Sequence, residues 1–233
     1  ESGEVFMLTV HHLAVSQSER IVWLCEELDL SYELVRYERD AQTKLAPSEY
    51  KALHPLGTAP VITDGDTVLA ESGAVVEYIL ARYGNGRLAP APNDSEFADY
   101  LFWFHFSNGS VMSTKRLFNL ASGAAAGAIN SDVMDALTGR LDVTHHLIEE
   151  RLGSVDYFAG NTFTAADIMN VFALTTMRVF IPFDLTDFPN IRAYLKRIGT
   201  RAAYQQAMKK GDLNRPPNLV QSEDGSFVPK ANT

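Results

Sequence analysis

The sequence predicts two unequal parts, a smaller α/β domain followed by an all-α domain. The chain opens with a strand–helix–strand pattern and continues with a hairpin turn signal, and after residue 86 its apolar residues recur with helical spacing. We therefore place the first domain at residues 1–86, a linker at 87–95, and a helical domain with an irregular C-terminal tail at 96–233. A chain of 233 residues can bury a sizeable core in one or two domains.

The first domain begins as a β-α-β unit. Residues 6–10 are apolar enough for a buried strand, and residues 32–35 suggest a second strand. Between them, residues 18–28 have the spacing of an amphipathic helix. The apolar face of that helix consists of Ile21, Leu24, Cys25 and Leu28. We expect the helix to connect the two strands by a right-handed crossover.

A hairpin and a further helix complete this domain. Residues 60–63 and 67–70 flank the sequence Asp-Gly-Asp at 64–66, which is a strong signal for a tight turn between antiparallel strands. A helical pattern over 75–83 follows and ends at Gly84. The first domain is thus expected to hold a small sheet with helices packed on it.

Helical periodicity dominates the second domain. An aromatic-rich helix is predicted over 96–120, and glycines among alanines interrupt the pattern at 121–129. A second long helix is predicted over 132–152, and two shorter ones over 189–198 and 202–210. The tail from residue 211, which has few apolar residues, is expected to be extended or disordered.

A capping motif marks the start of one more helix in this domain. Thr164 stands at the expected cap and Asp167 follows three residues later, just before an apolar run. Phe163 and Ile168 are placed to form a hydrophobic staple across the cap. This pattern supports folding and says nothing about chemistry.

Composition excludes several classes of function. The net charge of −9 and pI of about 5.1 argue against binding to nucleic acid or to an anionic membrane. A single cysteine excludes an internal disulfide framework and a Cys-x-x-Cys site. The sequence has no apolar stretch of membrane-spanning length, and its start is acidic where a signal peptide is basic. We expect a soluble, cytoplasmic protein.

Two short stretches predict a platform for a small peptide. In residues 53–62 (LHPLGTAPVI), Pro60 directly precedes an apolar run and would leave backbone groups unpaired at a strand edge. In residues 70–78 (AESGAVVEY), Ser72 would open a helix whose N–H groups suit a carboxylate. Taken alone, each stretch has a simpler interpretation. The bond before Pro60 would be an ordinary trans bond, because an X-Pro bond is cis in only about 5–6% of cases. Ser72 would be an ordinary helix cap, because most serine caps bind nothing.

The order and spacing of these stretches resemble the N-terminal, thioredoxin-like domain of the cytosolic glutathione transferases. The Thr-x-x-Asp box also resembles one in the family's sixth helix, so the likeness covers nearly the whole chain. The resemblance implies a cis bond between Ala59 and Pro60, with the Ala59 backbone pairing with the cysteinyl unit of glutathione. It also implies that Glu71 and Ser72 hold the γ-glutamyl end. Many members carry a lysine or glutamine shortly before the proline, which is missing here; His54 and Lys44 are the candidates to replace it.

Such an enzyme must hold the thiol of glutathione as a thiolate, which is the nucleophile. A free thiol titrates near pH 8.5, so lowering its pKa by about two units requires roughly 2.7 kcal/mol. One hydrogen bond to a charged group supplies about 1.5–3 kcal/mol, and a helix N-terminus adds about 0.3–1 kcal/mol. We therefore expect a hydroxyl donor between the first strand and the first helix, where the candidates are Ser16 and Ser18.

Ser16 is the preferred donor. It stands four residues before Arg20, which resembles the serine-type classes of the family, bacterial and fungal members among them. Ser16 with Glu19 also fits a capping box. The two roles are compatible, because a cap uses the hydroxyl oxygen as acceptor and would leave its proton free.

The electrophile is expected to lie between the domains, against the serine loop and the aromatic helix, in a mostly apolar pocket that suits a hydrophobic small molecule. The candidate pocket residues are His12, Trp103, Phe104, Asn108 and Met112. No metal site is assigned, because adjacent histidines on a strand point to opposite faces.

The leading prediction is a glutathione transferase, with glutathione as co-substrate, detoxification as its role and, by resemblance, a homodimeric state. Peroxide reduction, dehalogenation and ether cleavage on the same fold remain open. A second interpretation is a non-enzymatic binding or scaffold protein that keeps the fold. A disulfide oxidoreductase is disfavoured because the serine loop has no cysteine.

Overall fold

A computed structural model describes residues 8–123 and 130–212. The first two residues of the expected strand at 6–10, most of the expected break at 121–129, and the tail beyond residue 212 lie outside the described residues. The described chain divides into two compact units. One comprises residues 8–89 together with 199–212, and the other comprises residues 90–123 and 130–198.

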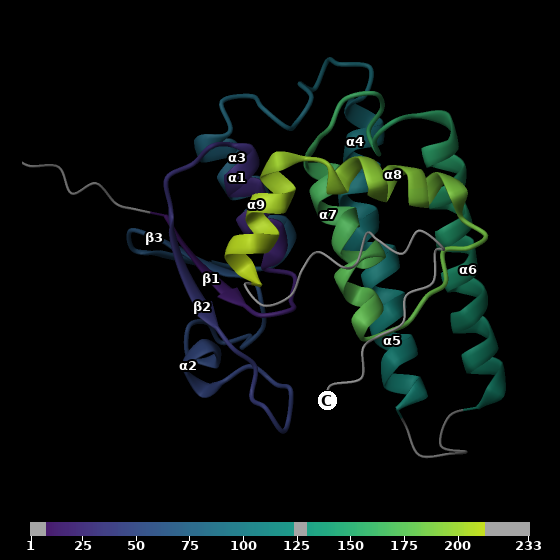
Figure 1. Cartoon of the computed structure of the whole chain (residues 1–233), viewed down its shortest axis with the longest axis horizontal. Coiled ribbons are helices and arrows are strands. Elements are labelled where there is room, and N and C mark those ends of the chain that lie inside the picture. Colours follow the sequence, from purple (N-terminus) through teal and green to yellow (C-terminus); the bar gives the residue numbers. More distant parts are fainter. Residues whose placement is uncertain (1–7, 124–129, 213–233) are drawn as a thin grey trace, which may run out of the picture. The chain divides into compact units, whose positions relative to one another are not determined.

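The first unit is built on a four-stranded sheet with the order β2-β1-β3-β4 (Figure 1). Its strands are β1 (Thr9–Leu13), β2 (Glu33–Tyr37), β3 (Val61–Asp64) and β4 (Thr67–Ala70). β1 pairs in parallel with β2 and antiparallel with β3, and β3 and β4 form the predicted hairpin. The prediction of an α/β first domain is confirmed.

Helices of the first unit cover the sheet. α1 (Glu19–Glu27) connects β1 to β2, and the four apolar residues predicted for its buried face are all buried. α3 (Ser72–Tyr83) follows β4 and packs beside α1. On the opposite face, Tyr50 of the short helix α2 (Ser48–Lys51) packs against Leu13 and Val61. Because side chains alternate along β1, Leu13 faces α2 while His12 faces the start of α1.

The last described helix, α9 (Ala202–Gly211), packs against α1 in the first unit (Figure 1). Arg201 donates to both carboxylate oxygens of Glu27 at 2.8 and 2.7 Å, and Lys210 donates to Glu26 at 2.7 Å. The rings of Trp23 and Tyr204 meet edge to face at 4.9 Å. The sequence pattern predicted this segment as part of the helical domain, whereas its contacts with α1 place it in the first unit.

The second unit is helical, as predicted. It contains α4 (Phe97–Phe106), η1 (Ser107–Met112), α5 (Ser113–Ser122), α6 (Ser131–Ser154), α7 (Ala165–Leu174), η2 (Thr176–Val179) and α8 (Pro189–Gly199). The helix predicted over 96–120 holds a π-helical segment, η1, between α4 and α5. Hydrophobic periodicity did not reveal it, because one residue inserted into a turn leaves the apolar pattern nearly intact.

The capping box at the start of α7 is confirmed. The Thr164 side chain accepts from the backbone N–H of Ala166, and Asp167 accepts from the N–H of Thr164 at 2.9 Å. Asp167 is fully buried and also accepts from the N–H of Phe158 and the hydroxyl of Tyr194, each at 3.0 Å. The motif therefore ties together three segments of the second unit.

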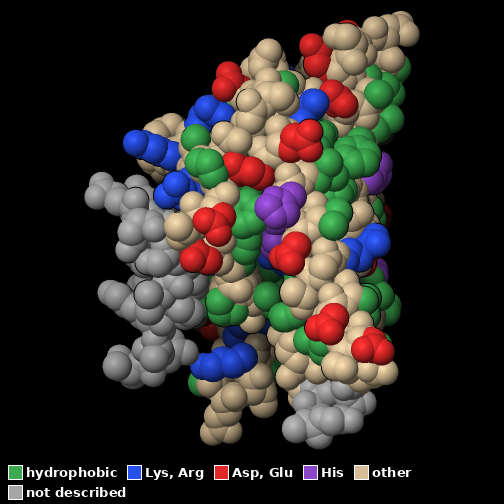
Figure 2. Space-filling view, turned by 90° about the vertical axis from the view of Figure 1, so that its right-hand side faces the viewer, with side chains coloured by type: hydrophobic (Ala, Val, Ile, Leu, Met, Phe, Trp, Pro, Cys, Tyr) green, Lys and Arg blue, Asp and Glu red, His purple; other side chains and the backbone are tan. Residues whose placement is uncertain are grey.

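The surface matches the acidic composition. Figure 2 shows Asp and Glu side chains spread over the face in view rather than gathered in one patch. Across residues 8–123 and 130–212, no helix is long and apolar enough to span a membrane.

Candidate functional site

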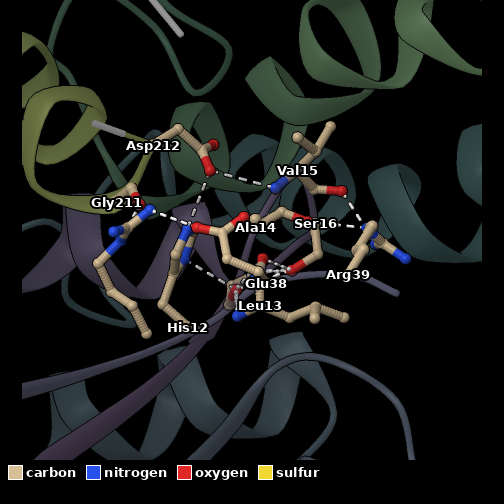
Figure 3. A network of polar contacts seen from close by, with 11 residues as sticks. His12, Leu13, Ala14, Val15, Ser16, Glu38, Arg39, Gly211 and Asp212 are labelled. Carbon is tan, nitrogen blue, oxygen red and sulfur yellow. Dashed lines mark hydrogen bonds and ion pairs between the residues drawn. The ribbon is translucent and has the colours of Figure 1, made fainter. Parts of the chain in front are cut away.

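The loop between β1 and α1 is held in an uncommon backbone conformation. Val15 has a φ of 52°, a region that costs a β-branched residue about 1–3 kcal/mol. Arg39 holds the loop from one side by donating to the carbonyls of Ala14 at 2.8 Å and Val15 at 3.0 Å. On the other side, the N–H of Val15 donates to Asp212 at 3.3 Å. These contacts fix the backbone on which Ser16 stands (Figure 3).

The two candidate serines lie together in this loop. Their Oγ atoms are 2.7 Å apart, and both side chains are buried. Ser16 donates to the carbonyl of Leu13 at 2.7 Å and accepts from the N–H of Ser18 at 3.2 Å. Ser18 accepts from the N–H of Leu13 at 3.1 Å. Both hydroxyls therefore lie at the N-terminus of α1, where a helix favours negative charge.

Two expectations about Ser16 need correction. In the predicted capping box, the backbone N–H of Glu19 would donate to the Ser16 hydroxyl. In the structure, that N–H donates to the backbone carbonyl of Ser16 at 3.1 Å. Nor is the hydroxyl proton free. A serine has one proton, and that of Ser16 is directed inward to Leu13 or Ser18.

The polar row continues from the serines to the end of α9. Ser18 Oγ lies 2.9 Å from Nδ1 of His12, and Nε2 of His12 lies 3.4 Å from Asp212 Oδ1 (Figure 3). Gly211 allows this approach, because a Cβ atom there would lie 3.1 Å from His12 Nε2. Arg36 secures the same helix end by donating to the carbonyl of Gly211 at 2.6 Å.

His12 was expected in the electrophile pocket, but its side chain is fully buried in this row. Sequence reasoning missed Asp212 and Arg39. No local signal indicates Asp212, because its partners lie about 200 positions earlier in the chain.

The residues of the predicted peptide platform lie near the serine loop. The Ala59–Pro60 bond is cis, as the resemblance implied and against the expectation from frequency alone. Ser72 is the first residue of α3 rather than its cap, a position taken by Glu71 with a φ of 71°. The buried Ser72 hydroxyl accepts from Arg20 at 3.0 Å, and Arg20 also donates to Gln17 beside Ser16. Arg20 thus links the serine loop to the start of α3.

The two candidates for the glycyl carboxylate have different settings. The carbonyl of exposed Lys44 accepts from Arg39 at 3.0 Å, so the same guanidinium joins Lys44 to the serine loop. Nδ1 of His54 accepts from the N–H of Leu56 at 3.2 Å, within its own turn. Lys44 is thus tied to the serine loop through its backbone, whereas His54 is bonded within its own turn.

The other expected pocket residues belong to the second unit. Trp103, Phe104 and Met112 are buried in its core, and the carbonyl of Trp103 accepts from Asn170 at 2.8 Å. Asn108, in η1, is partly exposed. The side chains of Trp103, Phe104 and Met112 therefore pack within their own unit.

Across residues 8–123 and 130–212, no group of three or more His, Cys, Asp or Glu side chains is arranged to hold a metal ion. His145 stacks on Phe183 at 3.7 Å between ring centroids, and burial lowers its pKa to about 3. Cys25 is buried in the core, and burial raises the pKa of its thiol. Such a buried structural thiol is inert.

Comparison with known proteins matches both units to one family. The model of the glutathione S-transferase N-terminal domain matches residues 8–81, and that of the C-terminal domain matches residues 128–202. Glutathione S-transferase 3 of Schizosaccharomyces pombe is 30% identical over 89% of each chain. A crystal structure of a glutathione S-transferase from Actinobacillus pleuropneumoniae is 34% identical and covers 94% of this chain and 98% of that one, with a TM-score of 0.82. A glutathione transferase from Phanerochaete chrysosporium, solved with oxidised glutathione, shares the fold at 21% identity over 91% of this chain and 98% of that one, with a TM-score of 0.71.

Proposed function

Because the chain belongs to the glutathione S-transferase family, we propose that it activates the thiol of glutathione as a thiolate and adds it to an apolar electrophile. The observation that carries this mechanism is the pair of buried hydroxyls, Ser16 and Ser18, at the N-terminus of α1. Ser16 donates to the thiolate. Ser18, which is fully buried and hydrogen-bonded to His12, contacts the Ser16 hydroxyl and positions it.

The energies favour a rotation of the Ser16 hydroxyl toward the sulfur. Leaving the carbonyl of Leu13 gives up a neutral hydrogen bond, a net loss of about 0.5–1.5 kcal/mol. A hydrogen bond to the charged thiolate gains about 1.5–3 kcal/mol, and the N-terminus of α1 adds about 0.3–1 kcal/mol. The gain exceeds the loss, so thiolate binding itself turns the hydroxyl outward.

The remaining parts of glutathione are assigned to the platform. The backbone of Ala59, before the cis Pro60, pairs with the cysteinyl unit. Glu71 and the N-terminus of α3 at Ser72 hold the γ-glutamyl end, because the carboxylate suits its ammonium group and the helix N–H groups suit its carboxylate. Lys44 is the candidate partner of the glycyl carboxylate. The electrophile is apolar, and family membership is the basis for proposing a homodimer, whose measured mass in solution tests it.

Titration of glutathione into the protein by calorimetry, with ultraviolet absorbance of the thiolate read on the same complex, tests the proposal. Binding with thiolate at neutral pH supports a transferase. Absence of binding at millimolar glutathione contradicts it and favours a scaffold role. Ser16→Ala should keep binding but lose most of the thiolate and most turnover, whereas Ser154→Ala, an exposed serine of the second unit, should change neither.

A further inference from the structure

The positions of the protons in the row Ser16–Ser18–His12–Asp212 follow from its chemistry. A carboxylate only accepts, so the His12 nitrogen that faces Asp212 carries a hydrogen and the nitrogen that faces Ser18 is an acceptor. Ser18 accepts from the N–H of Leu13 and gives its own proton to His12. The second lone pair of Ser18 then faces the Ser16 hydroxyl. The Ser16 hydroxyl lies 2.7 Å from both the Leu13 carbonyl and Ser18, so once its proton turns from Leu13 to Ser18, the protons of the row are ordered toward the imidazole.

We propose that this row is a proton relay in which His12, stabilised by Asp212, receives the thiol proton of glutathione. The inference rests on the proposed function, because it needs the thiol to bind at Ser16. The S–H bond breaks and its proton goes to Ser16 Oγ, while the Ser16 proton passes to Ser18 and the Ser18 proton to His12 Nδ1. The products are a thiolate and an imidazolium, and both hydroxyls are restored. After transfer, the proton returns along the same path to the leaving group or to water.

The distances fit such a relay. The two inner steps span 2.7 and 2.9 Å, within the range of proton-transferring hydrogen bonds. The outer contact of His12 with Asp212 is longer, at 3.4 Å. A positive imidazole would shorten it, since catalytic hydrogen bonds tighten once the substrate is bound. After the transfer, Ser18 donates to Ser16 and Ser16 donates to the thiolate, which is the hydroxyl orientation that the reaction needs.

The charges around His12 support an imidazolium at this position. Asp212 approaches from the end of α9, and α1 presents Ser18, with Glu19 next along the chain. β2 places Arg36 across the sheet from His12, but that guanidinium is engaged by the Gly211 carbonyl and by Glu38 at 3.0 Å. His12 acts through the two serines, so it is a positioning residue as well as the end of the relay.

The proton inventory of glutathione binding tests the relay. Calorimetry in buffers of different ionisation enthalpy counts the protons released, and ultraviolet absorbance counts the thiolate formed. The relay keeps the proton on the protein, so the wild type at pH 7 should release well under half of the about one proton per thiolate that unassisted ionisation releases. Release of about one proton for each thiolate overturns the relay while leaving the proposed function intact. Absence of thiolate overturns both.

Two variants sharpen this test. His12→Gln should form thiolate only at higher pH and release about one proton for each. Asp212→Asn keeps the shape of the side chain at the end of α9 and should lower the thiolate fraction at pH 7 about tenfold, by removing the partner of the imidazolium. The controls are His146→Gln and Asp29→Asn, which change exposed side chains that make none of the contacts of the row and should match the wild type. Equal proton release in His12→Gln and the wild type contradicts the proposal even where stability falls.

Discussion

Replacement of Arg39 by glutamine should loosen the serine loop and weaken thiolate formation. The guanidinium donates to the carbonyls of Ala14, Val15 and Lys44, at 2.8, 3.0 and 3.0 Å. Each such bond from a charged donor contributes about 1.5–3 kcal/mol when buried, and about half of that here, because Arg39 is only partly buried. Glutamine cannot reach three carbonyls, so we expect a loss of about 2–4 kcal/mol in the free energy of unfolding.

The loss should also appear in activity, because Val15 is held at a φ of 52° by these contacts. Once released, the loop can relax, and Ser16 then spends less time in the orientation that meets the sulfur. Urea unfolding and the thiolate absorbance of the glutathione complex measure the two effects. Arg87→Gln is the matched control, because Arg87 is an exposed arginine that also donates to a backbone carbonyl. Arg39→Gln with wild-type stability and wild-type thiolate would refute the reasoning.

Three further changes test other parts of the structure. Burial beside Arg178 lowers the pKa of Lys115 to about 8 from 10.5, so the wild type should gain unfolding free energy as pH rises from 8 to 10.5. Lys115→Met should lack that rise and be more stable by about 1–3 kcal/mol at pH 7 in urea unfolding; a less stable variant would contradict this. Cys25 should react with a thiol reagent only as fast as the protein unfolds, since it is buried and its thiol pKa is raised; fast labelling of the folded protein would show otherwise. Thr164→Ala should lower the thermal midpoint through loss of about 1–2 kcal/mol of capping energy while the thiolate signal stays unchanged; an unaltered midpoint would count against the cap.

Local patterns predicted the features whose causes are local. The buried face of α1 follows from apolar residues at helical spacing, the β3–β4 hairpin from its Asp-Gly-Asp turn, and the capping box from Thr164 and Asp167 three residues apart. In each case the interacting residues are neighbours in sequence, so that spacing alone carries the information.

Features that depend on distant contacts were missed. Asp212 follows α9 in a stretch with few apolar residues, and its role is visible only where α9 packs on α1 and brings it to His12. The direction of the Ser16 proton was mispredicted for a different reason: Leu13 and Ser18 are close to Ser16 in sequence, but the turn of the loop places them against its hydroxyl, and the residue pattern does not specify that turn. Distant contacts also explain Ser72. Serine is a residue type that often caps helices, but the hydroxyl of Ser72 accepts from Arg20, 52 positions earlier.

The most direct test of the central claim is the ultraviolet titration of bound glutathione across pH in the wild type and in Ser16→Ala. A hydroxyl donor to the thiolate predicts ionised glutathione at neutral pH in the wild type. It also predicts an ionisation constant of the bound thiol lower by about 10- to 150-fold in the variant, the equivalent of the 1.5–3 kcal/mol of one charged hydrogen bond. Equal titration curves for the two proteins, with glutathione bound to both, would contradict the account.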